Sequence, residues 1–593
     1  MTAATRPKLV AVPDPDEGPP DLAPPKEAPP AGERRPNLSK PPVKARRQRS
    51  RRPSLGELGY RAACLLYALP LYEQTLRSGS GRGAVSSVPD SWPGNGALGQ
   101  DIVQGQILLA GMKVPLTSDF QVSADLPTPA LDALHSFAWL RHLRAYGGDQ
   151  GRRRARELVT AWIYQERRWS RQVWAPPVLA ERLANLMGHY EFFAASGDIG
   201  LRQSLLRSLS RQAHHLMRCM PAGLVGADLI TAIKGLTVAG AAVEGCGAAL
   251  DKACSLLAKT LPRQVQADGG HIERSPALQL RILRDLLDIR AWLHLAEVEP
   301  PGALADAIQQ MAPLLKLLQQ ADGGLALFNG AVEEEGLMID LVLQRASGQQ
   351  RQLGSAPQSG FQRLRAGRIS VLVDAGRPPE PGLDFTSHAG TLSMEVTTGR
   401  QRLIVNCGAF PGSDTWAPLL RGTAAHSTLC LAERNSSEVL PSGGLGRRPA
   451  HVLCRRDERG GNQLLEVSHD GYQPLFGAEH HRRLALSEDG DALLGEDRLT
   501  GCGAGLPFAL RFHLHPSVQA SLSHGGGACL LRLPRGEGWR FRTQDMEIAL
   551  EPSIYFGHPE EPRRSLQIVL SGETGPDGMI AVWWLQREGK PRR

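Results

Sequence analysis

The chain has 593 residues, a hydrophobic fraction of 41% and a formal net charge of +8. This length is too great for one hydrophobic core, so two folded domains are expected. No stretch reaches the ~20 consecutive apolar residues of a membrane span, because the apolar run 65–71 is short and interrupted by Pro70. The opening is Pro-rich and charged, without the apolar centre of a signal peptide, so the default expectation is a cytoplasmic protein with no transmembrane segment.

Residues 1–54 differ in composition from the rest of the chain. They contain twelve Lys/Arg and six Asp/Glu, so they carry +6 of the net charge of +8. A Pro-rich, charged segment buries too little apolar surface to fold, so a disordered tail is expected here. The basic run at 40–52 is interpreted as a contact for an anionic partner or as a solubilising tail. No aromatic residues interleave its charges, so specific nucleic-acid binding is not expected.

Residues 55–345 have the apolar spacing of helices. Apolar residues recur every three or four positions in the segments 131–143, 155–163, 178–193, 201–217 and 278–295. Gly, Pro and Asp-Gly clusters separate these segments, which predicts helices stacked as antiparallel hairpins.

Residues 350–590 instead alternate apolar and polar side chains. The runs 369–376, 463–472, 509–516, 528–534 and 565–572 follow a period of two and are separated by frequent turns. A helical part followed by an all-β part predicts two domains that meet near residues 346–360. The nine cysteines lack C-x-x-C spacing, so neither a disulfide framework nor a zinc ribbon is indicated.

Two histidines stand out within residues 384–438. His388 and His426 flank two strand-like runs, and each has small neighbours, Ala389-Gly390 and Ala424-Ala425. Small neighbours leave room for a group to approach the imidazole rings. We therefore expect the two histidines to approach each other at turns that bracket neighbouring strands.

This arrangement resembles the C-terminal β-sandwich of the heparinase II/III family of polysaccharide lyases. The order of a helical part and a strand-rich part is also similar, and the resemblance covers about residues 90–572. It implies an incomplete α/α toroid followed by an antiparallel β-sandwich. It also implies β-elimination on a uronic-acid-containing acidic glycan, in which a base removes the C5 proton while the C4–O bond breaks.

The resemblance also implies where several functional residues lie: catalytic roles fall on His271, Glu273 and His388, and substrate contacts on Asp228 and Arg274. The alternative for His271, Glu273 and Arg274 is a structural role at a helix start. Arg421 is interpreted as a catalytic clamp for the sugar carboxylate, because guanidinium pairs with carboxylate bidentately. Arg182 and Asn185 are expected either to line the mouth of the toroid as substrate contacts or to bond a neighbouring loop. His388, Asn406 and His426 take the positions of a family metal site, which implies one divalent ion, zinc or calcium.

Several family positions carry other residues in this sequence. The family tyrosine falls at Leu278, and no tyrosine occurs between Tyr190 and Tyr472. The family Asn-His pair falls at Ala227-Asp228, and the first histidine of the H-x-H turn falls at Thr386. The acidic metal ligand falls at Asn406, which removes a negative charge that favours a divalent ion.

Two classes of function therefore remain open. One is a polysaccharide lyase in which other residues replace the usual base and acid. The other is a non-catalytic glycan-binding or polysaccharide-assembly protein that keeps the cleft without the chemistry. The expected partner in both cases is an acidic polysaccharide, and the family resemblance implies a periplasmic or envelope-associated location as the alternative to the cytoplasm. The sequence specifies neither the glycan nor the oligomeric state.

Overall fold

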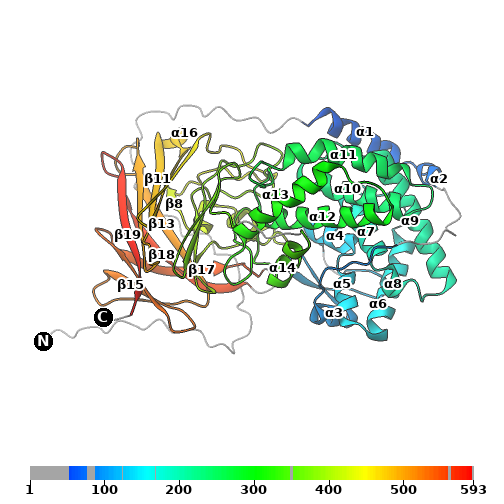
Figure 1. Ribbon diagram of the computed structural model, residues 1–593, viewed down its shortest axis with the longest axis horizontal. Coiled ribbons are helices and arrows are strands. Elements are labelled where there is room, and N and C mark those ends of the chain that lie inside the picture. The colour runs from blue at the N-terminus through cyan, green and yellow to red at the C-terminus, as the bar shows by residue number, and fades with distance from the viewer. Residues whose placement is uncertain are drawn as a thin grey trace. The chain divides into compact units, whose positions relative to one another are not determined.

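The computed structural model describes residues 53–76, 87–122, 125–166, 168–346, 352–558 and 562–589. The predicted tail at 1–54 lies almost entirely outside the described residues. A helical part comes first in the chain and a strand-rich part follows it (Figure 1). This order agrees with the change of apolar period near residue 350.

The helices of the first part pack in two rows. In one row, α4 contacts α7, α7 contacts α10, α10 contacts α12, and α12 contacts α14, while α9, α11 and α13 pack against this row and α6 packs against α9. Such a double row of hairpins is an α/α toroid. The helices are α1 (Leu55–Tyr67), α2 (Tyr72–Thr75), α3 (Gly96–Val103), α4 (Thr128–Ser136), α5 (Leu140–Tyr146), α6 (Gly148–Gln165), α7 (Pro176–Gly188), α8 (Tyr190–Phe193), α9 (Ile199–Cys219), α10 (Gly226–Ala242), α11 (Ala248–Gln264), α12 (Pro276–Leu295), α13 (Gly302–Leu318) and α14 (Gly336–Arg345).

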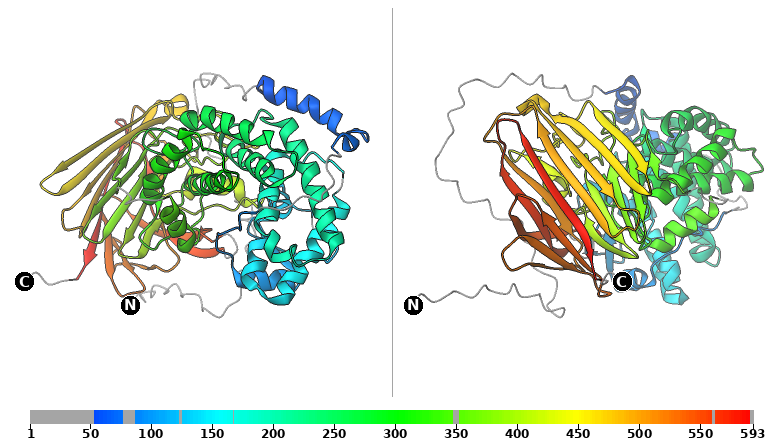
Figure 2. Two further views of the ribbon diagram at one scale, coloured as in Figure 1. Left: turned by 45° about the vertical axis from the view of Figure 1, so that its right-hand side comes forward. Right: turned by 60° about the vertical axis from the view of Figure 1, so that its left-hand side comes forward.

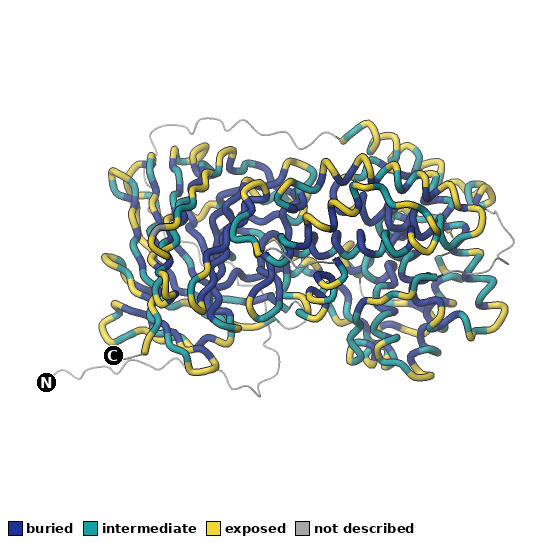
Figure 3. The backbone as a smooth tube through the Cα atoms, in the orientation of Figure 1, coloured by how far each residue is buried: buried dark blue, intermediate teal, exposed yellow. Residues whose placement is uncertain are grey.

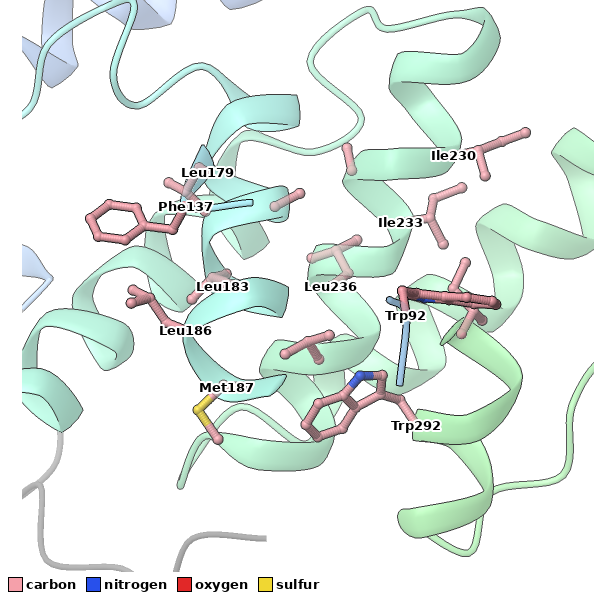
Figure 4. Close-up of a cluster of buried hydrophobic side chains, with 14 of the residues drawn as sticks. Trp92, Phe137, Leu179, Leu183, Leu186, Met187, Ile230, Ile233, Leu236 and Trp292 are labelled. Carbon is pink, nitrogen blue, oxygen red and sulfur yellow. The ribbon is translucent and has the colours of Figure 1, made fainter. Parts of the chain in front are cut away.

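The toroid core is apolar and densely packed. Leucines, isoleucines and tryptophans of α7, α10 and α12 meet in it, as Figure 4 shows for Leu183, Leu236 and Trp292. α10 is buried along most of its length because helices contact it on several sides. Its one lysine, Lys234, is held by Glu181 at 2.7 Å and by Asp285 at 2.6 Å. A buried charge needs such partners to offset its lost hydration.

The helical part also contains one strand pair that the apolar spacing did not predict. β1 (Gln106–Leu109) and β2 (Met112–Pro115) form an antiparallel hairpin. Its turn, Ala110-Gly111, has positive φ angles of 50° and 89°, as a two-residue hairpin turn requires. The strands of four residues are too short to show a clear period of two.

The second part is a sandwich of two antiparallel sheets (Figure 2). The 8-stranded sheet has the order β14-β15-β16-β19-β12-β11-β10-β9, and the 9-stranded sheet has the order β17-β18-β13-β7-β6-β5-β4-β3, with β8 paired to β13. The strands are β3 (Ser355–Ala356), β4 (Phe361–Ala366), β5 (Ile369–Asp374), β6 (Met394–Thr398), β7 (Gln401–Val405), β8 (Leu429–Leu431), β9 (Val452–Arg459), β10 (Asn462–Tyr472), β11 (Ala478–Leu486), β12 (Ala492–Thr500), β13 (Pro507–Leu514), β14 (Gln519–Leu522), β15 (Ala528–Arg532), β16 (Gly538–Thr543), β17 (Ile548–Tyr555), β18 (Arg563–Glu573) and β19 (Met579–Glu588). Short helical turns, α15 (Trp416–Leu420) and α16 (Gln473–Phe476), lie in its loops.

Side chains from both sheets fill the space between them. Phe512 of the 9-stranded sheet packs against Phe541 and Trp583 of the 8-stranded sheet, with ring centroids 4.9 and 4.8 Å apart. Buried segments run through both parts of the chain (Figure 3).

The helical part and the sandwich meet through apolar and charged contacts. Leu314 and Leu318 of α13 share a buried cluster with Phe361 and Leu372 of the sandwich. Arg274, just before α12, forms a buried ion pair with Asp374 at the end of β5. The Arg274 guanidinium also donates to the carbonyl oxygens of Ser359 at 2.6 Å and Arg377 at 2.8 Å. Arg274 is therefore an interdomain anchor.

We predict that Arg274→Met lowers the stability of the whole chain. The substitution leaves the buried Asp374 carboxylate without its cation, which costs about 3–5 kcal/mol in comparable buried pairs. The exposed pair Arg281–Asp228, 3.1 Å apart, supplies the control, because exposed pairs contribute about 0–1 kcal/mol. Thermal unfolding followed by circular dichroism should show a large fall in the thermal midpoint for Arg274→Met and almost no change for Arg281→Ala. Equal effects would contradict the anchor role.

Candidate functional site

The structure brings His388 and His426 together, as their placement in the sequence predicts. His388 Nδ1 lies 3.1 Å from His426 Nε2, and the rings meet edge to face. His426 Nδ1 lies 2.7 Å from the carbonyl oxygen of Gly422, which can only accept, so this nitrogen carries the proton. His426 Nε2 is therefore an acceptor, and His388 Nδ1 donates to it.

Both imidazoles are held neutral by their surroundings. Burial lowers the pKa of His426 to about 4 and holds the pKa of His388 well below its ordinary value. The room beside Gly390 is taken by the His426 ring, since a Cβ at Gly390 would lie 2.6 Å from His426 Cδ2. The small residues thus make space for the second histidine.

The donors around this pair do not fit a resident divalent ion. The lone pair of His426 Nε2 is used by His388, and the Asn406 Oδ1 accepts from the Ser427 backbone N–H at 2.9 Å. The other end of the Asn406 side chain is a buried N–H donor, which a cation would repel. No cluster of three His, Cys, Asp or Glu side chains with metal-binding geometry occurs within the described residues. A zinc or calcium site lacks its charged ligand here.

His388 is also connected to the interdomain anchor. Its backbone N–H donates to Asn329 Oδ1 at 3.1 Å, and Asn329 Nδ2 donates to the Arg274 carbonyl oxygen at 3.0 Å and to Asp374 Oδ2 at 3.3 Å. One buried chain of polar contacts therefore runs from Arg274 and Asp374 through Asn329 to the histidine pair. This chain fixes the turn that carries His388 against the helical part.

Glu273 lies in the same region but serves α10. Its Oε1 accepts from the Ala227 backbone N–H at 2.6 Å, at the positive end of that helix. Gly226 has a φ of 62°, and a Cβ there would lie 2.0 Å from Glu273 Oε1, so glycine is required for this approach. Burial, with the nearby charge of Asp228, raises the pKa of Glu273 to about 7.

His271 is buried beside Glu273. Its ring nitrogens lie 3.2 Å from Gln264 Oε1 and 3.3 Å from the Glu273 backbone nitrogen. Burial lowers the pKa of His271 to about 3, so this imidazole is neutral. Asp228 is largely exposed and pairs with Arg281.

The predicted clamp for a sugar carboxylate, Arg421, binds backbone carbonyls instead. Its Nε donates to Ser387 at 3.0 Å and its Nη2 to Gly444 at 3.1 Å. Burial lowers the pKa of Arg421. The guanidinium therefore fixes the loop that precedes His388.

Arg182 and Asn185 belong to the interior of the toroid. Arg182 Nε donates to Gln212 at 2.7 Å, and its guanidinium lies 4.5 Å from the Trp162 ring centroid. Burial lowers the pKa of Arg182 to about 9. Asn185 Nδ2 donates to the Ser136 carbonyl oxygen at 2.9 Å. Arg182 is thus committed to packing between helices, whereas Asn185 also lines a cavity of about 720 Å³ in the helical part, beside Lys234 and Asp288.

A different surface is exposed on α1, and the sequence interpretation missed it. Its inner face packs Tyr67 against Trp169 and His215, with ring centroids 5.9 and 4.9 Å apart. Its outer face and the turn after it expose six leucines, each between 47% and 89% accessible: Leu55, Leu58, Leu65, Leu66, Leu69 and Leu71. The run 65–71 was the available signal. No helix among the described residues is long and apolar enough to cross a membrane.

We predict that stability falls as the pH is lowered from about 6.5 to about 4. The pKa of His426 lies at about 4 in the fold, so between these values the unfolded chain binds more protons than the folded one. This difference is worth up to about 2 kcal/mol at about pH 5 for one such histidine. His426→Gln should therefore narrow the gap between the thermal midpoints at about pH 7 and pH 5. The control is His294→Gln at an exposed position of α12, which should keep the wild-type difference between the two midpoints. If His426→Gln also keeps the wild-type difference, the buried neutral His426 does not cause the loss of stability at low pH.

Comparison with known proteins places this geometry in a family. Residues 348–590 match the model of the heparinase II/III-like C-terminal domain. FtsZ-localized protein C of Caulobacter vibrioides is 31% identical over 518 residues, which cover 84% of this chain and 88% of that protein. The crystal structure of heparinase III shares the fold with a TM-score of 0.69 at 13% identity, covering 90% of this chain and 91% of that one. A heparan sulfate lyase mutant from Pedobacter heparinus has a TM-score of 0.56 at 15% identity, covering 91% and 90%. The chain therefore belongs to the heparinase II/III-like family, with FtsZ-localized protein C as a relative over most of its length.

Proposed function

We propose that this protein is a non-catalytic assembly protein that works beside FtsZ and is held on an anionic membrane surface by α1. The exposed leucine face of α1 is the observation that carries the proposal. The relative named for its localisation with FtsZ, which matches 84% of this chain, supports the choice of partner.

The leucine face has the properties of an interfacial membrane helix. Between Pro53 and Leu71 the only charged residues are Glu57 and Arg61, and Glu57 caps the start of α1 through Ser54. Burying one leucine side chain contributes about 1.5–3 kcal/mol, so even partial burial of six adds several kcal/mol. In water this surface is unfavourable, and a lipid interface removes that cost.

The sequence before α1 supplies the matching charge. Seven Lys/Arg residues and no Asp/Glu occur within residues 40–52, directly before the helix. Each basic residue near an anionic membrane contributes about 1 kcal/mol, and this attraction weakens with salt. An apolar helix joined to a basic segment therefore provides the two signals that stable peripheral binding needs.

The contacts around the histidine pair support a non-catalytic role. The histidine pair is closed on itself, Arg421 is bound to carbonyl oxygens, and Glu273 caps α10. β-Elimination needs a base and an acid free to reach the sugar.

The membrane proposal predicts binding to vesicles. The protein should co-sediment with phosphatidylglycerol-containing vesicles, and less at high salt, but not with vesicles of phosphatidylcholine alone. The double variant Leu65→Glu, Leu66→Glu should lose this binding, since both side chains would carry charge into the lipid interface. FtsZ added to the vesicles should co-sediment with wild type and remain in solution with the variant.

A leucine of similar exposure elsewhere gives the control. Leu337 at the start of α14 is 60% exposed, so Leu337→Glu should bind vesicles like wild type. Equal loss in both variants, or binding that is independent of Leu65 and Leu66, would overturn the role of α1.

Lyase activity is the second candidate, because Glu273 with a pKa raised to about 7 has the proton affinity of a general base. Incubation with a panel of acidic polysaccharides, followed by the absorbance of the unsaturated uronate, separates the two functions. We expect no product. Product formation that is lost in Glu273→Gln and kept in Asp228→Asn would establish a lyase instead.

A further inference from the structure

A cavity of about 720 Å³ lies in the helical part. Its walls come from the later turns of α7 and α12 and from residues 88–92. α12 begins at Pro276, just after Glu273, and Asp288 in the cavity wall lies twelve residues further along this helix, about 18 Å away. The cavity is therefore separate from the site around the histidine pair, and we call it the toroid cavity. Its volume is within the range of about 300–1,000 Å³ that small-molecule sites have.

Positive and negative side chains are balanced around the toroid cavity. Five Lys/Arg and five Asp/Glu side chains line it. Lys234 is paired with Glu181 and Asp285, and Arg141 Nε lies 3.3 Å from Asp90 Oδ2. A ligand with a net charge of either sign would come close to side chains of its own sign, which costs free energy. The cavity therefore favours a ligand without charged groups.

Polar atoms without partners remain in the walls of this cavity. Arg284 forms no hydrogen bond or ion pair with any residue that the structure describes. Asp288 Oδ1 accepts from Trp92 Nε1 at 2.9 Å, whereas its Oδ2 accepts from no donor in the described ranges. Asn185 Nδ2 donates to the Ser136 carbonyl oxygen, and Asn185 Oδ1 also lacks a donor among those residues. The cavity thus offers one guanidinium donor group and two oxygen acceptors to a ligand.

Hydroxyl groups match this mixture of donors and acceptors. A hydroxyl can donate one hydrogen bond and accept two, so neighbouring hydroxyls of one molecule can accept from Arg284 and donate to Asn185 and Asp288. Burial raises the pKa of Asp288 to about 7, so near neutral pH this carboxyl can donate as well as accept. Leu287 and Ala291 line the cavity at helical spacing from Arg284, and they offer apolar surface to ring carbons. A peptide matches less well, because it carries its donors and its acceptors on separate atoms.

We propose that the toroid cavity binds a neutral sugar. Arg284 donates to adjacent ring hydroxyls, Asn185 and Asp288 accept from others, and Leu287 and Ala291 contact the C–H face of the ring. Such binding satisfies polar groups that are otherwise left without partners inside the protein. The inference goes beyond the proposed membrane function and does not depend on α1.

Sugars that differ only in charge test the cavity directly. The probes are glucose, galactose and mannose, followed by the amino sugar and the uronic acid that correspond to the hexose that binds. Saturation-transfer difference NMR with the full chain at neutral pH should detect binding of at least one neutral hexose. The amino sugar and the uronic acid should each bind at least tenfold more weakly, since each brings a charge next to side chains of the same sign.

Two alanines give a matched pair of variants. Ala291→Trp fills the cavity with an indole and should abolish the signal of the hexose. Ala248→Trp places the same indole at an exposed position at the start of α11, so this variant should bind like wild type. If Ala291→Trp unfolds, Arg284→Lys decides the question. This variant keeps the positive charge but loses the planar fork, so it should bind the hexose at least tenfold more weakly.

Several outcomes would overturn the inference. The absence of a signal from all three neutral hexoses would mean that the toroid cavity holds only water. Binding that persists in folded Ala291→Trp, or at full strength in Arg284→Lys, would place the sugar elsewhere. Tighter binding of triglycine, with free or with blocked ends, would assign the cavity to a zwitterion or a peptide. Failure of vesicle binding leaves these measurements unaffected, so the membrane function and the sugar site fail independently.

Discussion

The buried ion pair between Arg274 and Asp374 is the contact on which the arrangement of the two domains depends. Arg274 comes from the loop before α12 and Asp374 from the end of β5, so the pair joins the helical part to the sandwich. Removing two charges from water is costly, and the attraction offsets this cost only where further hydrogen bonds complete both groups. The carbonyls of Ser359 and Arg377, and the amide of Asn329, provide them. Asn329 then carries the constraint to the His388 turn.

This constraint changes how the polar side chains near the histidine pair must be interpreted. In this region Glu273, Arg421 and the histidine pair all have partners within the protein, and those partners are backbone groups or each other. A group that stabilises a helix end or a loop in this way has its lone pairs and protons committed before any ligand arrives. These contacts stabilise the fold around the histidine pair, and the function proposed above uses the exposed face of α1 instead.

Among the described residues, the outer face of α1 is an exposed apolar surface, and in the proposed function a lipid interface covers it. This face is apolar and follows a basic sequence, so burial and charge would both favour binding to an anionic membrane.

The sequence by itself determined the order of the domains and the approach of two histidines. The change from a period of three to four residues to a period of two near residue 350 is a local property of the chain, since it reflects which faces are buried in helices and strands. His388 and His426 could be placed together because they lie at turns beside neighbouring strands, β6 and β7. The hairpin of β1 and β2 was not predicted, because a strand of four residues is too short to show a clear alternation of apolar and polar side chains.

Only the tertiary structure decided whether each polar side chain is free or bound. Arg182 and Arg421 have the residue type of a carboxylate clamp, yet one is packed on Trp162 and the other is bonded to Ser387 and Gly444. Their partners are distant in sequence, and hydrogen bonds between distant groups form only when the whole chain is folded. Leu65 and Leu66 show the converse. Apolar residues are expected to be buried, but α1 packs on the helical part through the face that carries Tyr67, so the side chains of Leu65 and Leu66 are exposed to solvent. The spacing of residues along the chain determines which face of a helix or strand a side chain occupies. The groups that this face contacts come from distant parts of the chain, so a local sequence pattern does not contain them.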